Sequence, residues 1–333
     1  MSAAFPDRIL ELGYAYREAK VLLSAVELGV FTALSERPLD LDTLINRIGI
    51  DQRGARDFLD ALVALDLLNR DDSGQYTCTP ETAAYLDRQK STYLGDELQY
   101  SVHLYARWNL LTRALRTGRP QNAAGVKGNY PVLYANSEAL EAFAKGMSAA
   151  TLSAATAIAE KVPWLKYQTI IDIGSAQGCL PVQLARVHAH LTGGGFDLPP
   201  LRPVFDKYVE EHGFSGRLRF YPGDFFQDQL PRADVLVMGR VLHNWNLATK
   251  KMLLKKAYEA LPAGGTLIIY ERLIDDARTN AAGLLSSLNM LVMTEGGFGF
   301  TGADCMSWMQ EAGFRDIRVE PLTNDQSMIM GAK

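Results

Sequence analysis

The stretch TIIDIGSAQGCL, residues 169–180, decides the fold of this chain. It begins with an apolar run and an aspartate, continues through a short loop flanked by Gly174 and Gly178, and ends in an apolar helical pattern. A strand, a glycine-containing turn and a helix in this order are the usual start of a site for a nucleotide-type cofactor. Asp172 stands where a pyrophosphate would have to approach, so the loop restricts which cofactor can bind.

The residues after Thr169 alternate between strand-like and helical segments. Strands are predicted at residues 169–173, 194–196, 218–221, 233–238 and 265–273. A final pair of runs, DIRVEPL and SMIMGA, is separated by a turn at residues 323–325. This order predicts an α/β fold, a doubly wound, Rossmann-like parallel sheet with an antiparallel hairpin at its edge.

Residues 1–95 are mostly helical, with few strands. Apolar residues recur at helical spacing in two segments, REAKVLLSAVELGVFTAL and ARDFLDALVALDLL. Between these two helices, PLDLDTLINRIGID predicts a short helix that ends at Gly49. The segment that follows all three, NRDDSGQYTCTP, predicts a small β-wing with its turn at residues 72–74. Three helices and a wing are typical of a winged-helix domain. We therefore expect a winged-helix domain at residues 1–95, a helical linker at 96–165 and a cofactor-binding domain at 166–333.

A winged helix raises the possibility of a DNA-binding regulator, which the charge pattern disfavours. Residues 1–100 contain 10 lysines and arginines against 17 acidic residues, and the segment that would enter the groove, DQRGARDFLDALVALDLL, carries four aspartates. Contacts to phosphate need the opposite balance. The formal net charge of the whole chain is −4, so we expect neither nucleic acid nor an anionic membrane as a partner.

The composition is that of an ordinary globular protein, with 47% apolar and 22% charged residues. The longest apolar stretches, such as LNMLVM, are too short to cross a bilayer, and the N-terminus lacks a basic region followed by an apolar one. The three cysteines are odd in number and widely spaced, which fits neither a disulfide framework nor a zinc site. We therefore predict a cytoplasmic protein without a metal centre.

Polar residues stand at or just beyond the ends of five successive predicted strands. In such sheets ligands bind beyond the carboxyl ends of the strands. The residues at these ends, in chain order, are Asp172 with Gly174, Asp197, Asp224, Arg240 with His243, and Glu271. The strands themselves are strongly apolar, yet all five end in polar residues at the same edge of the sheet. This pattern indicates a ligand site at that edge.

The loop favours S-adenosylmethionine (SAM) over a dinucleotide. GSAQG lacks the middle glycine that lets the backbone approach a pyrophosphate, and Asp172 would repel that group. SAM has no phosphate and carries an ammonium and a sulfonium instead. Asp197 follows Asp172 by 25 residues (197 − 172). This is close to the separation of about 20 residues expected between such a loop and an acid that binds a ribose diol. Asp224 and Phe225 suit the amine and the face of an adenine.

Six motifs in this order carry a family resemblance: DIGSAQG, FDLPP, GDFF, ADVLVMGRVLHNW, LPAGGTLIIYE and SLNMLVMTEGG. Together they resemble the acetylserotonin O-methyltransferase-like and caffeate-type small-molecule methyltransferases, over essentially the whole chain. The resemblance implies a homodimer formed through an N-terminal winged-helix dimerisation domain. It also implies a class I, SAM-dependent methyl transfer to a hydroxyl group of a small aromatic acceptor.

The resemblance also assigns roles to individual residues. His243 takes the place of the general base, and Glu271 at the next strand end is expected to hold its imidazole, although Glu271 could instead pair with Arg272. The residues assigned to SAM are Tyr134, Asp172, Gly174, Asp197, Gly223, Asp224, Phe225 and Arg240. The residues assigned to the acceptor pocket are Met147, Asn244, Asn289 and Met293.

Four positions depart from the family pattern, in three places. Ser175 and Ala176 replace two loop glycines, Asn244 replaces the aspartate after the histidine, and Gly299 stands where many relatives carry a glutamate beside the histidine. With fewer carboxylates near His243, methylation at carbon or nitrogen, or a SAM-assisted reaction of another kind, stays open as an alternative.

Overall fold

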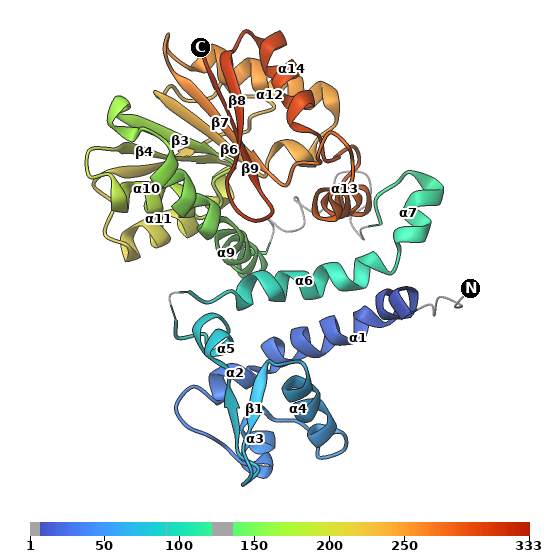
Figure 1. Cartoon of the computed structure of the whole chain (residues 1–333). Helices are drawn as coiled ribbons and strands as arrows, with labels where there is room; N and C mark the ends of the chain where they lie inside the picture. The colour runs from blue at the N-terminus through green and yellow to red at the C-terminus, as the bar shows by residue number, and fades with distance from the viewer. Residues whose placement is uncertain (1–6, 91, 122–135) are drawn as a thin grey trace. The chain divides into compact units, whose positions relative to one another are not determined.

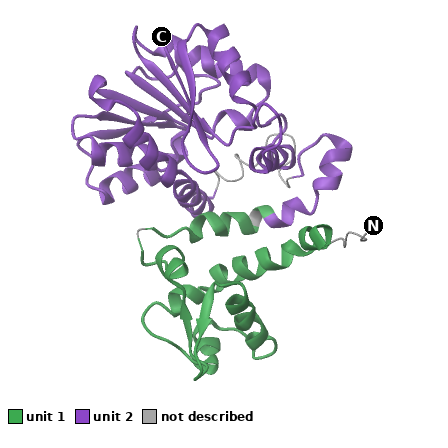
Figure 2. Ribbon diagram, viewed as in Figure 1, with its two compact units in different colours: residues 1–104 green, residues 105–333 purple. Residues whose placement is uncertain are grey.

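The computed structural model describes residues 7–90, 92–121 and 136–333. It divides into two compact units, residues 1–104 and 105–333 (Figure 2). The predicted three-part division at residues 95 and 165 stays a prediction, because the segment between these positions is shared by the two units.

The first unit is a helical domain with a two-stranded wing (Figure 1). Strands β1 (Leu68–Arg70) and β2 (Tyr76–Cys78) pair antiparallel, so the predicted wing is confirmed. The helices that begin in this unit are α1 (Asp7–Leu28), α2 (Val30–Ala33), α3 (Leu41–Ile48), α4 (Ala55–Ala64), α5 (Pro80–Tyr85) and α6 (Gly95–Trp108), which continues into the second unit.

Local chemistry sets the ends of these helices. Asp40 accepts the backbone N–H of Thr43 at 2.8 Å and so caps α3, which ends at Gly49 with φ of 71°. Thr79 and Thr82 form a reciprocal capping box at the start of α5. A buried cluster that includes Phe31, Leu59 and Tyr76 closes the core of the unit.

The second unit is built on a seven-stranded sheet with the order β5-β4-β3-β6-β7-β9-β8. Its strands are β3 (Thr169–Ile173), β4 (Thr192–Asp197), β5 (Leu218–Pro222), β6 (Val235–Gly239), β7 (Thr266–Glu271), β8 (Arg315–Pro321) and β9 (Ser327–Ala332). The first five strands are parallel, and β9 runs antiparallel between β7 and β8. The predicted doubly wound sheet with an antiparallel hairpin at its edge is therefore confirmed.

Helices cover both faces of this sheet (Figure 1). One face, with Ile171 and Leu236, packs against α12 and α14; the other, with Ile170 and Val237, packs against α9 and α10. Ile171 and Ile173, the two neighbours of Asp172, point to the same face because side chains alternate along a strand, and they are apolar and buried because helices cover that face. The helices of this unit are α7 (Leu111–Thr117), α9 (Ser137–Lys161), α10 (Cys179–Val187), α11 (Arg202–Glu211), α12 (Leu247–Ala260), α13 (Ala281–Met293) and α14 (Gly302–Ala312), with single turns η2 (Trp164–Lys166), η3 (Pro199–Leu201) and η4 (Leu242–Asn244).

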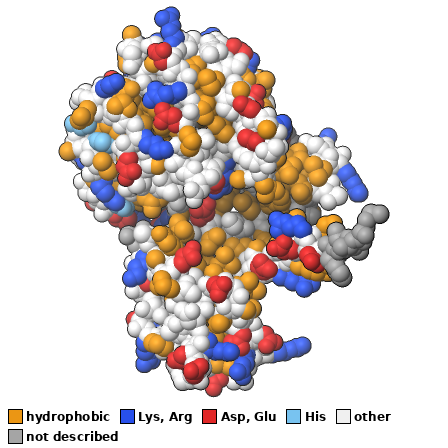
Figure 3. All heavy atoms as spheres, viewed as in Figure 1, with side chains coloured by type: hydrophobic (Ala, Val, Ile, Leu, Met, Phe, Trp, Pro, Cys, Tyr) orange, Lys and Arg blue, Asp and Glu red, His pale blue; other side chains and the backbone are white. Residues whose placement is uncertain are grey.

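No helix among the described residues is long and apolar enough to cross a membrane. On the face shown in Figure 3, lysine and arginine side chains are interspersed with aspartate and glutamate. The expectation that nucleic acid is not a partner stays a prediction from the charge of the sequence.

Candidate active site

The carboxyl ends of five parallel strands meet at one edge of the sheet. Because β4 and β6 both pair with β3, the end of each lies beside the loop that begins at Gly174. The next strands outward, β5 and β7, continue this edge on both sides. The sheet therefore brings the polar residues predicted at the strand ends to the same side of the unit.

The glycine loop is shaped for close approach. Gly174 has φ of 76°, and a Cβ there would lie 2.9 Å from the Val241 side chain, so a larger residue would be strained and crowded. Ala176 also has a positive φ, 48°, although it replaces a family glycine. Its backbone N–H donates to Asp197 Oδ2 at 2.9 Å. A hydrogen bond to the neighbouring strand end therefore holds the loop in place at Ala176.

Asp197 is positioned to receive hydroxyl groups. Its Oδ2 accepts from Ala176 and its Oδ1 accepts from the backbone N–H of Leu198 at 2.8 Å. Each oxygen has a second lone pair, so the carboxylate can still accept the two hydroxyls of a ribose diol. Burial raises the pKa of Asp197 to about 6, against the lowering effect of the two backbone N–H groups.

Asp172 is a second buried carboxyl group at this edge, 5% exposed. Burial raises its pKa well above the ordinary value, and the charge of Asp197 raises it further. Two carboxyl groups that repel one another in a buried position are stabilised in their ionised form by a cation. The electrostatics at the end of β3 and β4 therefore suit a positively charged ligand.

Two buried polar atoms beside these carboxyl groups have no hydrogen-bond partner among the described residues: Ser175 Oγ and Arg240 Nη1. Arg240 also has a strained φ of 55°. Buried donors without a partner usually mark the place of a ligand or an ordered water. SAM would bring a carboxylate for an arginine, positive groups for acidic residues and a diol for Asp197, so the residues present fit the predicted cofactor.

The loop after β5 contains Gly223, Asp224 and Phe225. A Cβ at Gly223 would lie 2.4 Å from the Phe196 ring, so only glycine fits there. Asp224 stabilises its own turn by accepting from Phe226 N–H at 2.9 Å and from the Gln227 side chain at 3.0 Å. The Phe225 ring packs edge-on against Trp245, with centroids 5.7 Å apart. The loop is thus tied to the segment that carries His243.

His243 and Glu271 lie in direct contact. His243 Nδ1 is 2.5 Å from Glu271 Oε2, and the backbone N–H of His243 donates to Glu271 Oε1 at 3.3 Å. The Glu271 side chain is 2% exposed and that of His243 is 15% exposed. Arg272, the other partner considered for Glu271, pairs with Asp325 at 2.6 Å.

Asn244 holds the loop after β6 in shape. Its Nδ2 donates to the backbone carbonyls of Arg240 at 3.0 Å and Val241 at 3.3 Å. An aspartate, the residue that the resemblance implies here, has no donor for these carbonyls. The departure from the family pattern therefore has a local structural reason, and the predicted contact of Asn244 with an acceptor stays a prediction.

Asn289 and Met293 lie on α13, which packs against η4, the turn that contains His243. Trp108 Nε1 donates to Asn289 Oδ1 at 3.0 Å, a contact that sequence reasoning missed. The sequence offers one general signal for such a contact: a tryptophan that is partly buried needs an acceptor for its indole N–H. This rule does not name the acceptor. Met147 is half-buried on α9. Tyr134 lies outside the described residues.

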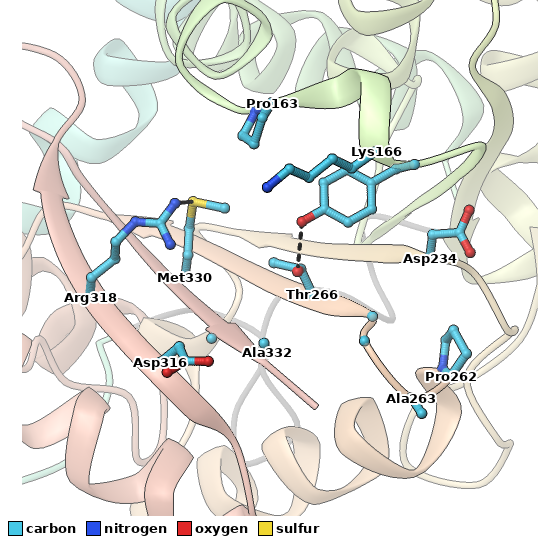
Figure 4. Close-up of a pocket in the computed structure, with 14 residues that line it drawn as sticks. Pro163, Lys166, Asp234, Pro262, Ala263, Thr266, Asp316, Arg318, Met330 and Ala332 are labelled. Carbon is cyan, nitrogen blue, oxygen red and sulfur yellow. Dashed lines mark hydrogen bonds between the residues drawn. The ribbon is translucent and has the colours of Figure 1, made fainter.

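A separate cavity of about 470 Å³ lies at the opposite edge of the sheet (Figure 4). Thr266, the first residue of β7, accepts or donates a 2.9 Å hydrogen bond with Tyr167 there, and Lys166, Asp234 and Arg318 also line the cavity. None of the predicted site residues lines it. Among the described residues, no group of three or more His, Cys, Asp and Glu side chains could hold a metal ion.

Comparison with known proteins agrees with this architecture. A model of the O-methyltransferase domain matches residues 108–315, and a model of the O-methyltransferase dimerisation domain matches residues 10–88. The human N-acetylserotonin methyltransferase, solved in complex with SAM, superposes with a TM-score of 0.91 at 26% identity, covering 100% of this chain and 99% of that one.

Two curated relatives are similar over almost their full lengths. The tetracenomycin polyketide synthesis 8-O-methyl transferase of Streptomyces glaucescens is 40% identical, covering 98% of this chain and 97% of the relative. The N,N-dimethyltransferase OxyT of Streptomyces rimosus is 37% identical, covering 95% of this chain and 92% of the relative. These matches confirm the resemblance read from the motifs: the chain belongs to the family of SAM-dependent O-methyltransferases that carry an N-terminal dimerisation domain.

Proposed function

We propose that this enzyme transfers the methyl group of SAM to a hydroxyl group of a small aromatic metabolite, with His243 as the general base. The observation that carries the proposal is the contact of His243 Nδ1 with Glu271 Oε2 at 2.5 Å, beside the strand ends that fit the cofactor. A histidine held by a buried carboxylate is a common arrangement for proton abstraction.

Glu271 sets the state of the imidazole. A carboxylate only accepts hydrogen bonds, so Nδ1 carries the ring proton and Nε2 keeps its lone pair. Nε2 can then take the proton of the acceptor hydroxyl as the oxygen attacks. Glu271 offsets the positive charge that the ring acquires, and the backbone N–H of His243 keeps the carboxylate oriented.

The chain binds and orients both substrates. When bound, SAM supplies a methyl group already activated by a positively charged sulfur. We assign Asp197 to the ribose diol, Asp172 to the positive charge and Arg240 to the carboxylate of the cofactor. Gly223, together with Asp224 and Phe225, is assigned to the adenine. Most of the rate enhancement then comes from positioning the acceptor oxygen in line with the methyl group.

An aromatic polyketide-like acceptor is favoured by the similarity to the tetracenomycin 8-O-methyl transferase. We assign Asn289 and Met293 of α13, together with Met147 and Asn244, to the acceptor pocket. An amide and flexible thioethers suit a flat, partly polar ring system, because the thioethers adapt to its faces and the amide can hydrogen-bond its oxygens.

Methylation at nitrogen is the second candidate, favoured by the 37% identity to a relative named an N,N-dimethyltransferase. Methylation at carbon and a SAM-assisted reaction of another kind are further alternatives. An uncharged amine acceptor needs no deprotonation before attack, so it would depend less on His243 than a phenol does.

We further propose that the protein acts as a homodimer through its N-terminal domain, as the match to a dimerisation domain supports. Its cysteines, Cys78, Cys179 and Cys305, are free thiols, in keeping with the predicted cytoplasmic location.

Product analysis tests the proposal. The purified protein is incubated with methyl-labelled SAM and matched polycyclic acceptors that carry either a phenolic hydroxyl or an aromatic amine. Label in an aryl methyl ether supports O-methylation. Label found only on nitrogen or carbon would replace the proposal by the corresponding alternative.

A further inference from the structure

Lys250 is a buried cation close to the predicted base. It lies in the first turn of α12 and is 0% exposed. An ammonium group is costly to remove from water, and the first turn of a helix carries the positive end of the helix dipole. Desolvation and the helix dipole both disfavour a charged lysine at this position. The contacts of its ammonium group must therefore offset both costs.

The ammonium group joins two segments that are distant in the chain. Nζ donates to the backbone carbonyl of Trp245 at 2.6 Å and to that of Phe298 at 3.0 Å. It also lies 3.2 Å from the centroid of the Phe298 ring. Trp245 follows His243 by two residues, whereas Phe298 belongs to the loop after α13.

The loop after α13, residues 294–300, packs directly against the backbone of His243. A Cβ at Gly297 would lie 2.6 Å from the carbonyl oxygen of His243. Gly299 N–H donates to Ser287 Oγ at 3.0 Å, which ties the loop to α13, the helix assigned to the acceptor. A shift of this loop would therefore move the predicted acceptor helix relative to His243.

We propose that Lys250 is a positioning residue, which holds the segment of His243 and the loop of residues 294–300 together and so fixes the imidazole relative to α13. The inference rests on the proposed role of His243 as the base. Burial lowers the pKa of Lys250 to about 8, while the charge of Glu271 raises it. Below that pH its hydrogen bonds are charge-assisted and correspondingly strong.

Lys256 provides a matched comparison on the same helix. Its Nζ donates to the backbone carbonyls of Phe225 at 2.6 Å and Asp228 at 2.8 Å. The chemistry is that of Lys250, but the segment that it holds is the predicted adenine loop. The two lysines should therefore affect different kinetic constants.

The test uses Lys250→Met, Lys250→Gln and Lys256→Met in the full chain. Turnover, acceptor KM, SAM affinity by calorimetry and the melting temperature are measured for each. Lys250→Met should lower kcat by about 10–100-fold, because a shift of about 1 Å at a reacting group has that effect, and should change the SAM Kd by less than about twofold. Lys250→Gln should recover part of kcat, because its amide can donate to both carbonyls. Lys256→Met should act mainly on SAM affinity.

A double-variant cycle separates this inference from the proposed base. His243→Ala alone tests the base. If Lys250 acts through His243, Lys250→Met should cost less than about threefold in turnover in a His243→Ala background. An equal loss in both backgrounds overturns the inference even where His243→Ala shows that the base is right. Parallel losses of kcat and SAM affinity in Lys250→Met and Lys256→Met, following the melting temperature, would also overturn it, since a structural role alone gives that result.

Discussion

His243 and Glu271 lie 28 residues apart in the chain, yet their side chains meet at 2.5 Å. The meeting follows from the sheet: β6 and β7 are parallel neighbours with Gly239 opposite Tyr270, so the turn after β6 reaches the end of β7. Glu271 is a strand residue and nearly inaccessible to solvent, so its carboxylate is held by the core rather than by a loop. This rigidity makes the pair suitable for a test of the proposed base.

Replacing His243 should remove turnover but not cofactor binding. His243→Ala is expected to lower kcat by roughly 10²–10⁴-fold, the usual size of a general-base contribution, with SAM affinity nearly unchanged. Glu271→Gln should cost less, because in the proposed mechanism Glu271 orients the imidazole without carrying the proton. Turnover on a phenolic acceptor and calorimetric SAM binding are the two measurements. Near wild-type turnover of His243→Ala would exclude the proposed base.

SAM binding should weaken in acid because of Asp197. Burial raises the pKa of this carboxyl group from 3.8 to about 6, so between these values the folded protein holds a proton that the unfolded chain has released. Through this group the free energy of unfolding therefore falls as the pH rises across the window. A cationic ligand favours the ionised form, so SAM affinity should rise as the pH increases through about 6, by up to about tenfold per pH unit below that value.

Calorimetry at several pH values, in buffers of different ionisation enthalpy, measures both the affinity and the proton released. Asp197→Asn serves as the control, because an amide does not titrate: the part of the dependence that this variant removes belongs to Asp197, and any part that remains belongs to another group such as Asp172. Asp197→Ala should lose about 1.5–3 kcal/mol of SAM binding free energy for a lost charge-assisted hydrogen bond. A wild-type affinity that is constant across the window would contradict the assignment of Asp197 to the ribose.

Removing the indole N–H of Trp108 should impair acceptor binding. Trp108 Nε1 donates to Asn289 Oδ1, which fixes the side-chain amide and turns its NH₂ group away from the indole. Trp108→Phe keeps the ring but loses the donor, so acceptor KM should rise about fivefold, the equivalent of about 1 kcal/mol, with SAM affinity unchanged.

Trp164→Phe is the matched control for this change. Trp164 Nε1 also donates at 3.1 Å, to the carbonyl of Ile158 within the buried core. Its loss should lower the melting temperature without changing acceptor KM. Equal effects of the two variants on KM would show that the Trp108 contact has no special relation to the acceptor.

The first helix should carry part of the dimer interface. Ile9, Leu12 and Tyr16 share one face of α1 and are 73%, 61% and 54% exposed. Leu12→Glu combined with Tyr16→Glu should yield a monomer in size-exclusion chromatography with light scattering, since charges at an apolar interface are poorly tolerated. Leu165→Glu, at a leucine of the second unit that is 87% exposed, should leave the assembly unchanged. A double variant that remains fully dimeric would place the interface elsewhere.

Deleting residues 1–95 tests the same domain more severely. If this domain forms the dimer and the active enzyme needs that dimer, the remaining fragment should be insoluble or inactive. A well-behaved, fully active monomeric fragment would refute the requirement.

The sequence by itself determined the sheet and most of the candidate site. Runs three to nine residues long mark the predicted strands, and parallel strands must end at a common edge, so the polar residues at the end of each run are brought together wherever the helices lie. This rule predicted that Asp172, Asp197 and Glu271 share one edge. The acidic loop around Asp172 also indicates a cationic cofactor from the sequence alone.

Only the tertiary structure decided which side chains pair across that edge. Lys250 contacts Phe298, which lies 48 residues further along the chain, and Trp108 contacts Asn289, 181 residues further along. No sequence periodicity links positions so far apart. In the sequence, Lys250 stands among the polar residues of a helix start and gives no sign of being buried. Its burial arises because the loop after α13 folds back over α12. A hydrogen bond between distant segments depends on the packing of the helices and loops that carry them, and that packing is a property of the whole unit rather than of any local stretch of chain.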